Sequence, residues 1–495
     1  MEAILTNRFY GPREWALVAL ASIALSSGVA AAASFGLARG IFAATLILIW
    51  AVILVRNIMA GLILLLLVRS WLDFSTDFRL PLPAMLAYLN PAGIIAGIFS
   101  IVAAIYLLRH FRGIRVPRAG RWFAVFLVLT ALIIPFATLP LTSVQEWVKV
   151  LAPFCAYLVM FLYFRSLSAS GVRQAASRGV AIIMLASAAP LAIGMYQLIT
   201  NTGQHLNEGF NRVYGTFPMP NGLAGYISLI IPILICAMQL WTDLLKRTLL
   251  VIVIVFALVV LVATYTRAAW FSLVASLVVL IVTARRIRIG PLLFIAVLAI
   301  AGYLVAWESI SARFSDLSGQ GYQDSSLLGR LNIWDAAIPL LFKNPVTGQG
   351  LGMFAINMGM FEAQDVPGQA SATVIAAHND YLRVLVETGA IGFVLYFGTF
   401  AIFIRNTWKT WKASDVPEVK AVARAFIAVC VGQLVASTAE NMFGQPALQF
   451  YFWSLAGVAA GLALDPNAVN TGMVPGLQPD QVRWPAPNDP AEDMA

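Results

Sequence analysis

The chain has 495 residues, of which 60% are apolar and 11% charged, and its mean hydropathy is +0.83. A soluble domain carries about 45–50% apolar and about 25% charged residues, so the excess apolar surface here must face lipid. This composition excludes a soluble multidomain enzyme, a secreted disulfide scaffold and a disordered chain. Transporters, channels and membrane-embedded enzymes remain.

The net charge of +9 does not indicate a nucleic-acid partner, because the basic residues separate hydrophobic runs. Orientation of a membrane protein by cytoplasmic Lys and Arg produces this pattern. Cys155, Cys236 and Cys430 each lie inside an apolar run. We interpret them as small buried side chains, and we expect neither a disulfide nor a thiolate metal site.

A membrane-spanning helix needs about 20 mostly apolar residues. Fourteen segments qualify, and they predict an all-α polytopic transmembrane bundle. They cover residues 15–35, 41–55, 57–68, 91–108, 122–139, 147–164, 180–199, 219–241, 248–264, 268–284, 291–306, 388–404, 421–438 and 447–464. Only Arg56 separates the second from the third, so this pair could form one tilted span or a re-entrant pair, which would leave twelve or thirteen crossings.

Placing both termini in the cytoplasm puts most of the 32 basic residues inside. We keep the first run as a membrane anchor, because thirteen further runs follow it. Three parts are expected: N-terminal transmembrane helices (1–200), a catalytic membrane domain (201–464) that includes one large external loop (308–387), and a Pro-rich disordered cytoplasmic tail (465–495).

The large external loop also carries a helical pattern. Leu331, Trp334, Ile338 and Leu341 recur every three to four residues, which places them on one helix face. We expect this helix to lie on the membrane surface with Trp334 at the level of the lipid headgroups.

The chain has three histidines, and one of them is a candidate catalytic base. His378 follows the large external loop where the chain returns to the membrane, so it can face both water and a lipid-borne substrate. A helix-capping or merely polar role for His378 stays open. His110 lies in a cytoplasmic basic cluster, and His205 has no evident partner. Downstream of His378, residues 380, 383 and 387 (Asp, Arg and Glu) predict a self-neutralising charge stripe.

Three arginines at the external membrane boundary suit a lipid diphosphate. Arg212 precedes a turn before the eighth span, Arg267 lies in a tight hairpin, and Arg330 opens the surface helix. A guanidinium keeps its charge at low dielectric and binds phosphate oxygens with paired donors. Each arginine taken singly could equally extend to lipid headgroups.

Other signals are weaker. The glycine-rich segment 348–354 is interpreted as a turn, because no strand precedes it. Asp73 and Asp77 could share a cation, but two carboxylates are too few for a site, and no His or Cys cluster predicts zinc. An ion-coupled transporter is disfavoured, since apart from Arg56 no span carries a charge at its centre.

Four segments carry a resemblance to a known family. They read RVYGTFPMPNGLAGY, TRAAW, GRLNIWDAAIPLLFKNPVTGQGLGMF and HNDYLRVLVETGAIG, in this order. This stretch, roughly residues 205–400, resembles the O-antigen ligase and Wzy-type polysaccharide polymerase family of bacterial inner membranes. The block that begins with His378 is its most specific part.

The resemblance implies a membrane glycosyltransferase of the broad C type, which draws on a sugar chain linked to undecaprenyl diphosphate at the periplasmic face. Arg212 and Arg267 resemble the diphosphate-binding arginines, with Arg330 as a third. His378 resembles the histidine that deprotonates or orients the acceptor hydroxyl. The resemblance implies no cofactor and no metal, and direct displacement would invert the anomeric centre.

Polymerase and ligase share these motifs and differ in their acceptor. A polymerase extends another lipid-linked glycan, a ligase glycosylates lipid A core, and a third relative glycosylates protein. The number of spans and the spacing of the histidine block favour a polymerase.

Overall fold

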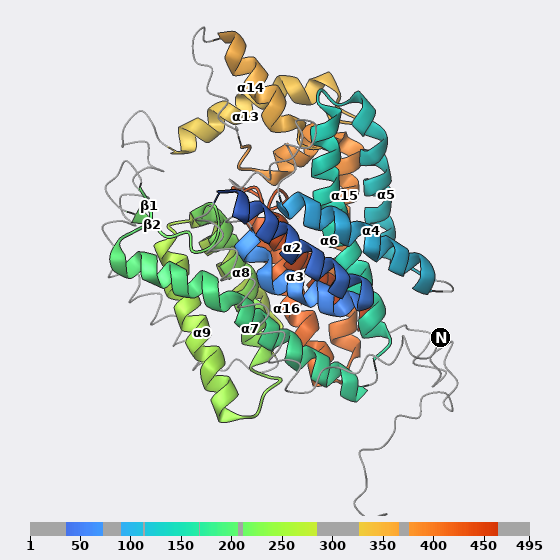
Figure 1. Cartoon of the computed structure of the whole chain (residues 1–495), viewed down its shortest axis with the longest axis vertical. Helices are drawn as coiled ribbons and strands as arrows, with labels where there is room; N and C mark the ends of the chain where they lie inside the picture. Colours follow the sequence, from blue (N-terminus) through green and yellow to red (C-terminus); the bar gives the residue numbers. More distant parts are fainter. Residues whose placement is uncertain are drawn as a thin grey trace, which may run out of the picture.

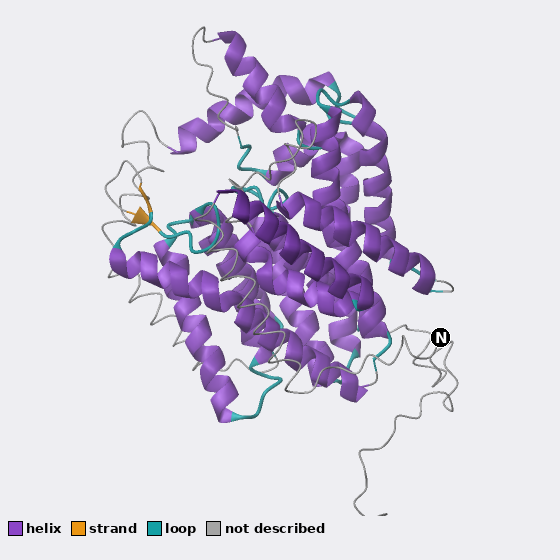
Figure 2. Ribbon diagram, in the orientation of Figure 1, coloured by secondary structure: helices purple, strands orange, loops and turns teal. Residues whose placement is uncertain are grey.

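The structure is a computed structural model that describes residues 36–72, 91–111, 114–167, 169–205, 211–284, 326–365 and 376–463. In this part the regular elements are helical except for one hairpin, whose two strands have two residues each (Figure 2). The all-α polytopic fold is therefore confirmed. The predicted spans 15–35 and 291–306, the tail 465–495 and the pair Asp73 and Asp77 lie outside the described residues.

Twelve predicted spans coincide with described helices. Before residue 201 these are α2 (Gly36–Arg56), α3 (Ile58–Leu72), α4 (Pro91–His110), α5 (Arg118–Ile133), α6 (Pro140–Arg165) and α7 (Ala169–Thr200). After it come α8 (Pro220–Ala237), α9 (Leu244–Ala263), α10 (Arg267–Val282), α15 (Asp380–Ala413), α16 (Pro417–Ala436) and α17 (Pro446–Gly461). Eight of the described helices are both long and apolar enough to cross a bilayer.

The segment 41–68 forms two helices and not one tilted span. The chain turns at Asn57, whose Oδ1 accepts a hydrogen bond of 3.1 Å from the backbone N–H of Ala60. Trp50 Nε1 donates to the carbonyl of Gly61 across the turn, at 2.9 Å. A Cβ at Gly61 would overlap Leu54, so glycine is what lets α2 and α3 lie this close (Figure 1).

Helix α6 and helix α17 form the centre of the bundle. A Cβ at Gly457 would overlap the carbonyl oxygen of Tyr157, which shows how closely the two backbones approach. Trp453 of α17 packs on Phe123 of the neighbouring α5, with ring centroids 4.1 Å apart. One hydrophobic core runs from Trp50 to Leu462, so helices before and after residue 200 share it. The domain division at that residue stays a prediction.

The loops that matter for function meet at one end of the bundle. Helices α8, α10, α15 and α17 begin there, and α7, α9 and α16 end there. Beside them lies the two-residue antiparallel hairpin of β1 (Gln204–His205) and β2 (Asn211–Arg212), which the sequence did not predict. The basic residues Arg165, Arg247 and Lys420 lie at the other ends of their helices, as the charge pattern predicts.

Two further helices from the predicted external loop lie across this end (Figure 1). They are α13 (Ser326–Lys343) and α14 (Met353–Asp365). Ala337 and Leu340 of α13 are buried with Phe354 of α14 and Val386 of α15 in a small separate core. The periodicity therefore predicted helix α13 correctly. The prediction for Trp334 was wrong: its side chain points to the bundle, where Nε1 donates to the carbonyl of Ala377, and not to the lipid headgroups.

Candidate functional site

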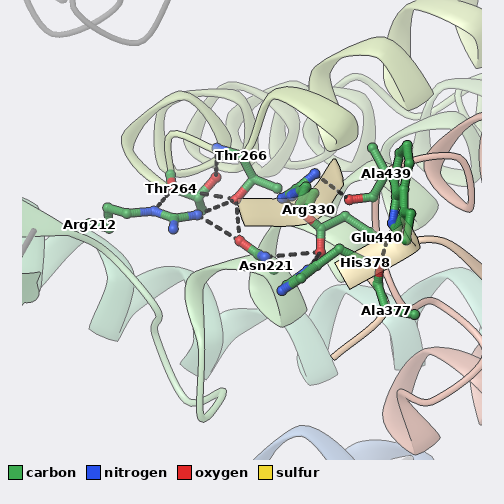
Figure 3. Close-up of polar contacts among 10 residues, drawn as sticks. Arg212, Asn221, Thr264, Thr266, Arg330, Ala377, His378, Ala439 and Glu440 are labelled. Carbon is green, nitrogen blue, oxygen red and sulfur yellow. Dashed lines mark hydrogen bonds and ion pairs between the residues drawn. The ribbon is translucent and has the colours of Figure 1, made fainter. Parts of the chain in front are cut away.

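Six segments meet at this end of the bundle and share one polar network (Figure 3). They are the β2 strand, the start of α8, the α9–α10 turn, helix α13, the residues around His378 and the short α16–α17 connection. Three of the four site residues predicted from the sequence, Arg212, Arg330 and His378, belong to this network through side-chain contacts. Arg267 directly follows Thr266, which belongs to the network.

Arg212 is held by the turn between α9 and α10. Its Nε donates to the carbonyl of Thr264 at 2.7 Å, and its Nη2 donates to Thr266 Oγ1 at 2.9 Å and to Asn221 Oδ1 at 2.6 Å. The β1–β2 pairing and the bond from Val213 N to the carbonyl of Ala263 fix the strand that carries it. The α9–α10 turn and the first turn of α8 thus fix the position of the guanidinium.

Arg267 is the first residue of α10 and directly follows Thr266. Its side chain is half-buried. The residue two positions before it, Tyr265, has a φ of 51°, a left-handed conformation that is uncommon for a non-glycine residue. This tight connection brings Arg267 to the same end of the bundle as Arg212, as the sequence predicts for a short external hairpin.

Glu440 is the centre of the network, and the sequence analysis missed it. Its side chain is 4% exposed. One carboxylate oxygen, Oε2, accepts from Asn221 Nδ2 at 2.9 Å and lies 3.6 Å from His378 Nδ1, while Oε1 lies 3.5 Å from Arg330 Nη2. A lone acid in a short connection between two spans offers no periodic pattern, so only its position on the external side could have indicated it.

Arg330 reaches the same connection from helix α13. Its Nη1 donates to the carbonyl of Ala439 at 2.8 Å, in addition to the ion pair with Glu440. Its side chain remains 21% exposed. One turn further along α13, Trp334 Nε1 donates at 2.8 Å to the carbonyl of Ala377, the residue before the histidine. Helix α13 thus contacts both the α16–α17 connection, which carries Glu440, and the residue that precedes His378.

His378 occupies a strained backbone position. Its φ is 47°, in the left-handed region that most side chains avoid. Asn379 caps α15 by accepting from Leu382 N at 3.1 Å, and Asp380 N donates to the carbonyl of Ser437 at 2.8 Å, so the two residues that follow His378 are held in place. The imidazole side chain is 32% exposed, which leaves it accessible to a substrate.

A second charged cluster lies next to this network, on the first turns of α15. Arg383 pairs with Glu387 at 3.2 Å and with Glu146 of α6 at 3.6 Å, and Lys149 also pairs with Glu146. The predicted charge stripe is therefore present for Arg383 and Glu387. Asp380 differs from that prediction, because it accepts hydrogen bonds from Ser437 Oγ and Phe443 N, each at 2.9 Å.

The glycine-rich segment 348–354 packs on this cluster and is a turn, as interpreted from the sequence. Gly348, Gly350 and Gly352 all have positive φ, at 78°, 102° and 77°. Gly350 N donates to the carbonyl of Glu387 at 2.9 Å, and Phe354 N lies 3.4 Å from its carboxylate. The segment covers Glu387, which is buried.

No group of three or more His, Cys, Asp or Glu side chains capable of holding a metal ion is present within the described ranges. The expectation that the protein uses no metal stays a prediction. What the site does offer is a set of cationic donors, one accessible imidazole and one buried carboxylate that connects them.

Fold and site together define a multi-pass helical membrane protein with an arginine, histidine and glutamate network at one end of its bundle. Residues 252–397 match the family model described as O-antigen ligase. Over these residues the chain is similar to O-antigen ligases, so the resemblance found in the sequence is confirmed there. The matched segment contains Arg267, Arg330 and His378, whereas Arg212 and Glu440 lie on either side of it. A search of curated proteins found no match.

Proposed function

We propose that this protein is a bacterial inner-membrane glycosyltransferase that polymerises undecaprenyl-diphosphate-linked oligosaccharide at the periplasmic face. One observation supports this assignment above the others. His378 and Arg212 are joined through Glu440 and Asn221 by contacts of 3.6, 2.9 and 2.6 Å. A base for the acceptor and a cation for the donor are thus held together at one membrane boundary.

The arginines would bind the donor. Arg212, Arg267 and Arg330 all lie at the end of the bundle that this proposal takes as external, where a polyprenyl carrier would present its diphosphate. Paired N–H donors match phosphate oxygens and stabilise the negative charge that develops as the diphosphate departs. A diphosphate is already a good leaving group, so this site needs no general acid.

His378 would activate the acceptor. Glu440 faces Nδ1, so a proton on that nitrogen leaves Nε2 to accept the proton of the acceptor hydroxyl. The hydroxyl oxygen then forms the new bond to the anomeric carbon, and the bond from that carbon to the diphosphate oxygen breaks with its electron pair. Displacement on the opposite face inverts the anomeric centre. No metal or cofactor takes part.

Glu440 would position the histidine and not touch the substrate. Its carboxylate is almost fully buried and three neighbouring side chains surround it. A buried carboxylate beside an imidazole fixes the ring orientation and favours the imidazolium that forms during proton transfer. The 3.6 Å separation is longer than a hydrogen bond, and catalytic contacts of this kind tighten when the substrate binds.

An O-antigen ligase is the second candidate, and the description of the matched family model favours it. A ligase would use the same donor and transfer its glycan to lipid A core, and a related enzyme would transfer it to protein. We place the polymerase first because twelve described helices and two further predicted spans give fourteen crossings, which is more typical of polymerases. This arrangement also places both termini in the cytoplasm.

A lipid-linked oligosaccharide transporter is a candidate from a different class. Ion-coupled carriers keep ionisable residues near the middle of the membrane. Among the described residues, the buried charged side chains are Arg69, Asp380, Glu387 and Glu440. Each belongs to a connection or to the first or last turns of its helix and not to the middle of a span, so this distribution favours an enzyme.

The test uses the purified full-length protein in liposomes with a synthetic polyprenyl-diphosphate oligosaccharide. A polymerase lengthens the lipid-linked glycan when no other acceptor is present. A ligase needs added lipid A core, and a protein glycosyltransferase needs a protein acceptor. Movement of the intact donor across the bilayer, with no new glycosidic bond under any of these conditions, would establish the transporter and overturn the proposal.

A further inference from the structure

Helix α13 carries an exposed apolar stripe that no other described element covers. Leu331, Ile338 and Phe342 are spaced seven and four residues apart, which places them on one side of a helix with about 100° per residue. Their side chains are 41%, 46% and 73% exposed. Asp335 lies at one edge of this stripe and is also exposed.

Contacts on the opposite side of α13 fix the direction of the stripe. Ala337 and Leu340 are buried against α14 and α15. Trp334 bonds to the carbonyl of Ala377 and Arg330 to that of Ala439, both at 2.8 Å. Because these residues hold α13 by its inner face, the stripe must point away from the bundle.

The stripe continues into the lipid-facing surface of a spanning helix. Just after α13, Val346 is 53% exposed and its carbonyl accepts from Ile391 N of α15 at 3.4 Å. Ile391 and Val394 are themselves 45% and 57% exposed on this membrane-spanning helix. The apolar surface of α13 therefore joins a surface that faces acyl chains.

The remaining side of α13 is exposed and contains polar residues. The polar residues Asn332 and Lys343 lie on it, together with the small side chain of Ala336. The helix thus has one side on the protein, one apolar side outward and one polar side outward. This division is typical of helices that lie in the plane of a membrane interface, with their apolar side about 5–10 Å into the boundary between headgroups and acyl chains.

We propose that α13 is an interfacial helix whose Leu331, Ile338 and Phe342 side chains insert into the outer leaflet, between phospholipid headgroups and acyl chains. The occupant of this face is phospholipid, because the stripe is continuous with the lipid-facing surface of α15. The bilayer surface then holds the two residues of α13 that contact the site, Arg330 and Trp334, at a fixed height above it.

The experiment measures lipid contact directly and does not need turnover, so its result is independent of the proposed activity. A nitrobenzoxadiazole probe is attached to Phe342→Cys in the full-length protein, in liposomes of phosphatidylethanolamine and phosphatidylglycerol. The native cysteines are all buried, which favours labelling at the introduced thiol. Ala336→Cys, on the polar side of the same helix, is the matched control, and Ile338→Cys is a second test position.

We expect brominated phospholipid to quench the probe at 342 and 338 at least about twofold more than at 336, because only the stripe inserts. Aqueous iodide should give the opposite order. Equal iodide quenching at all three positions without lipid quenching would overturn the proposal. Shielding from both quenchers, with disulfide cross-linking of Phe342→Cys between two chains, would assign the stripe to a second copy and also overturn it.

Discussion

Asn221 donates a hydrogen bond of 2.9 Å from Nδ2 to the Oε2 atom of Glu440. The same amide accepts from Arg212 through its Oδ1. Asn221 therefore links the residue proposed to bind the donor with the carboxylate that faces the proposed base. A short side chain at the start of α8 thus connects the two halves of the proposed reaction.

Replacing His378 by alanine should abolish transfer while the protein remains folded and inserted. The imidazole is partly exposed and contributes little packing, so the loss is that of a general base, roughly 10²- to 10⁴-fold in kcat. Transfer is measured with purified enzyme in liposomes, and folding by thermal denaturation in detergent.

His205→Ala is the matched control, because His205 lies in β1 with an exposed side chain. This variant should retain transfer. Near wild-type turnover by His378→Ala in the same preparation would remove His378 from the proposed mechanism.

Glu440→Gln should lower kcat and leave donor affinity nearly unchanged. Glutamine preserves the shape and an acceptor for Asn221, but it removes the charge that faces His378 and Arg330. We expect a loss of roughly 10- to 1000-fold in kcat, since an orienting carboxylate acts through the imidazole. Partial recovery in Glu440→Asp would distinguish a charge effect from misfolding.

Glu418→Gln is the control for a removed carboxylate, because Glu418 pairs with Arg173 near the start of α16, away from the site. A Glu440→Gln variant that lost donor binding as strongly as turnover would indicate that Glu440 supports the donor site and not the histidine.

Arg212→Lys should weaken donor binding by about tenfold or more, which corresponds to about 1.4 kcal/mol. An ammonium cannot reproduce the directional donors that now reach Thr264, Thr266 and Asn221, nor bind a phosphate with paired N–H groups. Affinity is measured with a fluorescent polyprenyl diphosphate.

Arg267→Lys should behave in the same way, while Arg173→Lys, with a side chain 66% exposed, should not. Unchanged donor affinity in both Arg212→Lys and Arg267→Lys would return these arginines to a role in binding lipid headgroups.

Some of this site follows from the sequence because it depends on local pattern. The positions of Arg212, Arg330 and His378 were predicted from residue type and from their place beside apolar runs. Glu440 and Asn221 were not, because they are 219 residues apart and meet only through the packing of α8 on α16. Helix α13 was predicted from its period, but which side faces inward depended on contacts with α14 and α15 that no local pattern contains.

Transfer should continue in the presence of a chelator. The proposed chemistry stabilises the departing diphosphate with guanidinium groups, which do not require a divalent ion. The assay compares initial rates with EDTA and with added Mg²⁺. Loss of activity with EDTA that Mg²⁺ restores would show that a cation takes part and would contradict the metal-free mechanism.

Gly389→Ala should destabilise the protein, because the backbone at this position cannot take a side chain. Gly389 has a φ of 64° within α15, and a Cβ there would overlap the backbone of Val346. The segment after α13 is fixed at this point, since Ala390 N donates to the carbonyl of Pro345 at 2.9 Å. The strain and the displaced loop should cost about 1–3 kcal/mol of unfolding free energy.

Gly97→Ala in α4 is the control: its Cβ would meet nothing within 4 Å, so we expect an unchanged or slightly higher thermal midpoint. Equal midpoints for the two variants would mean that the 345–348 segment can move away from α15 without loss.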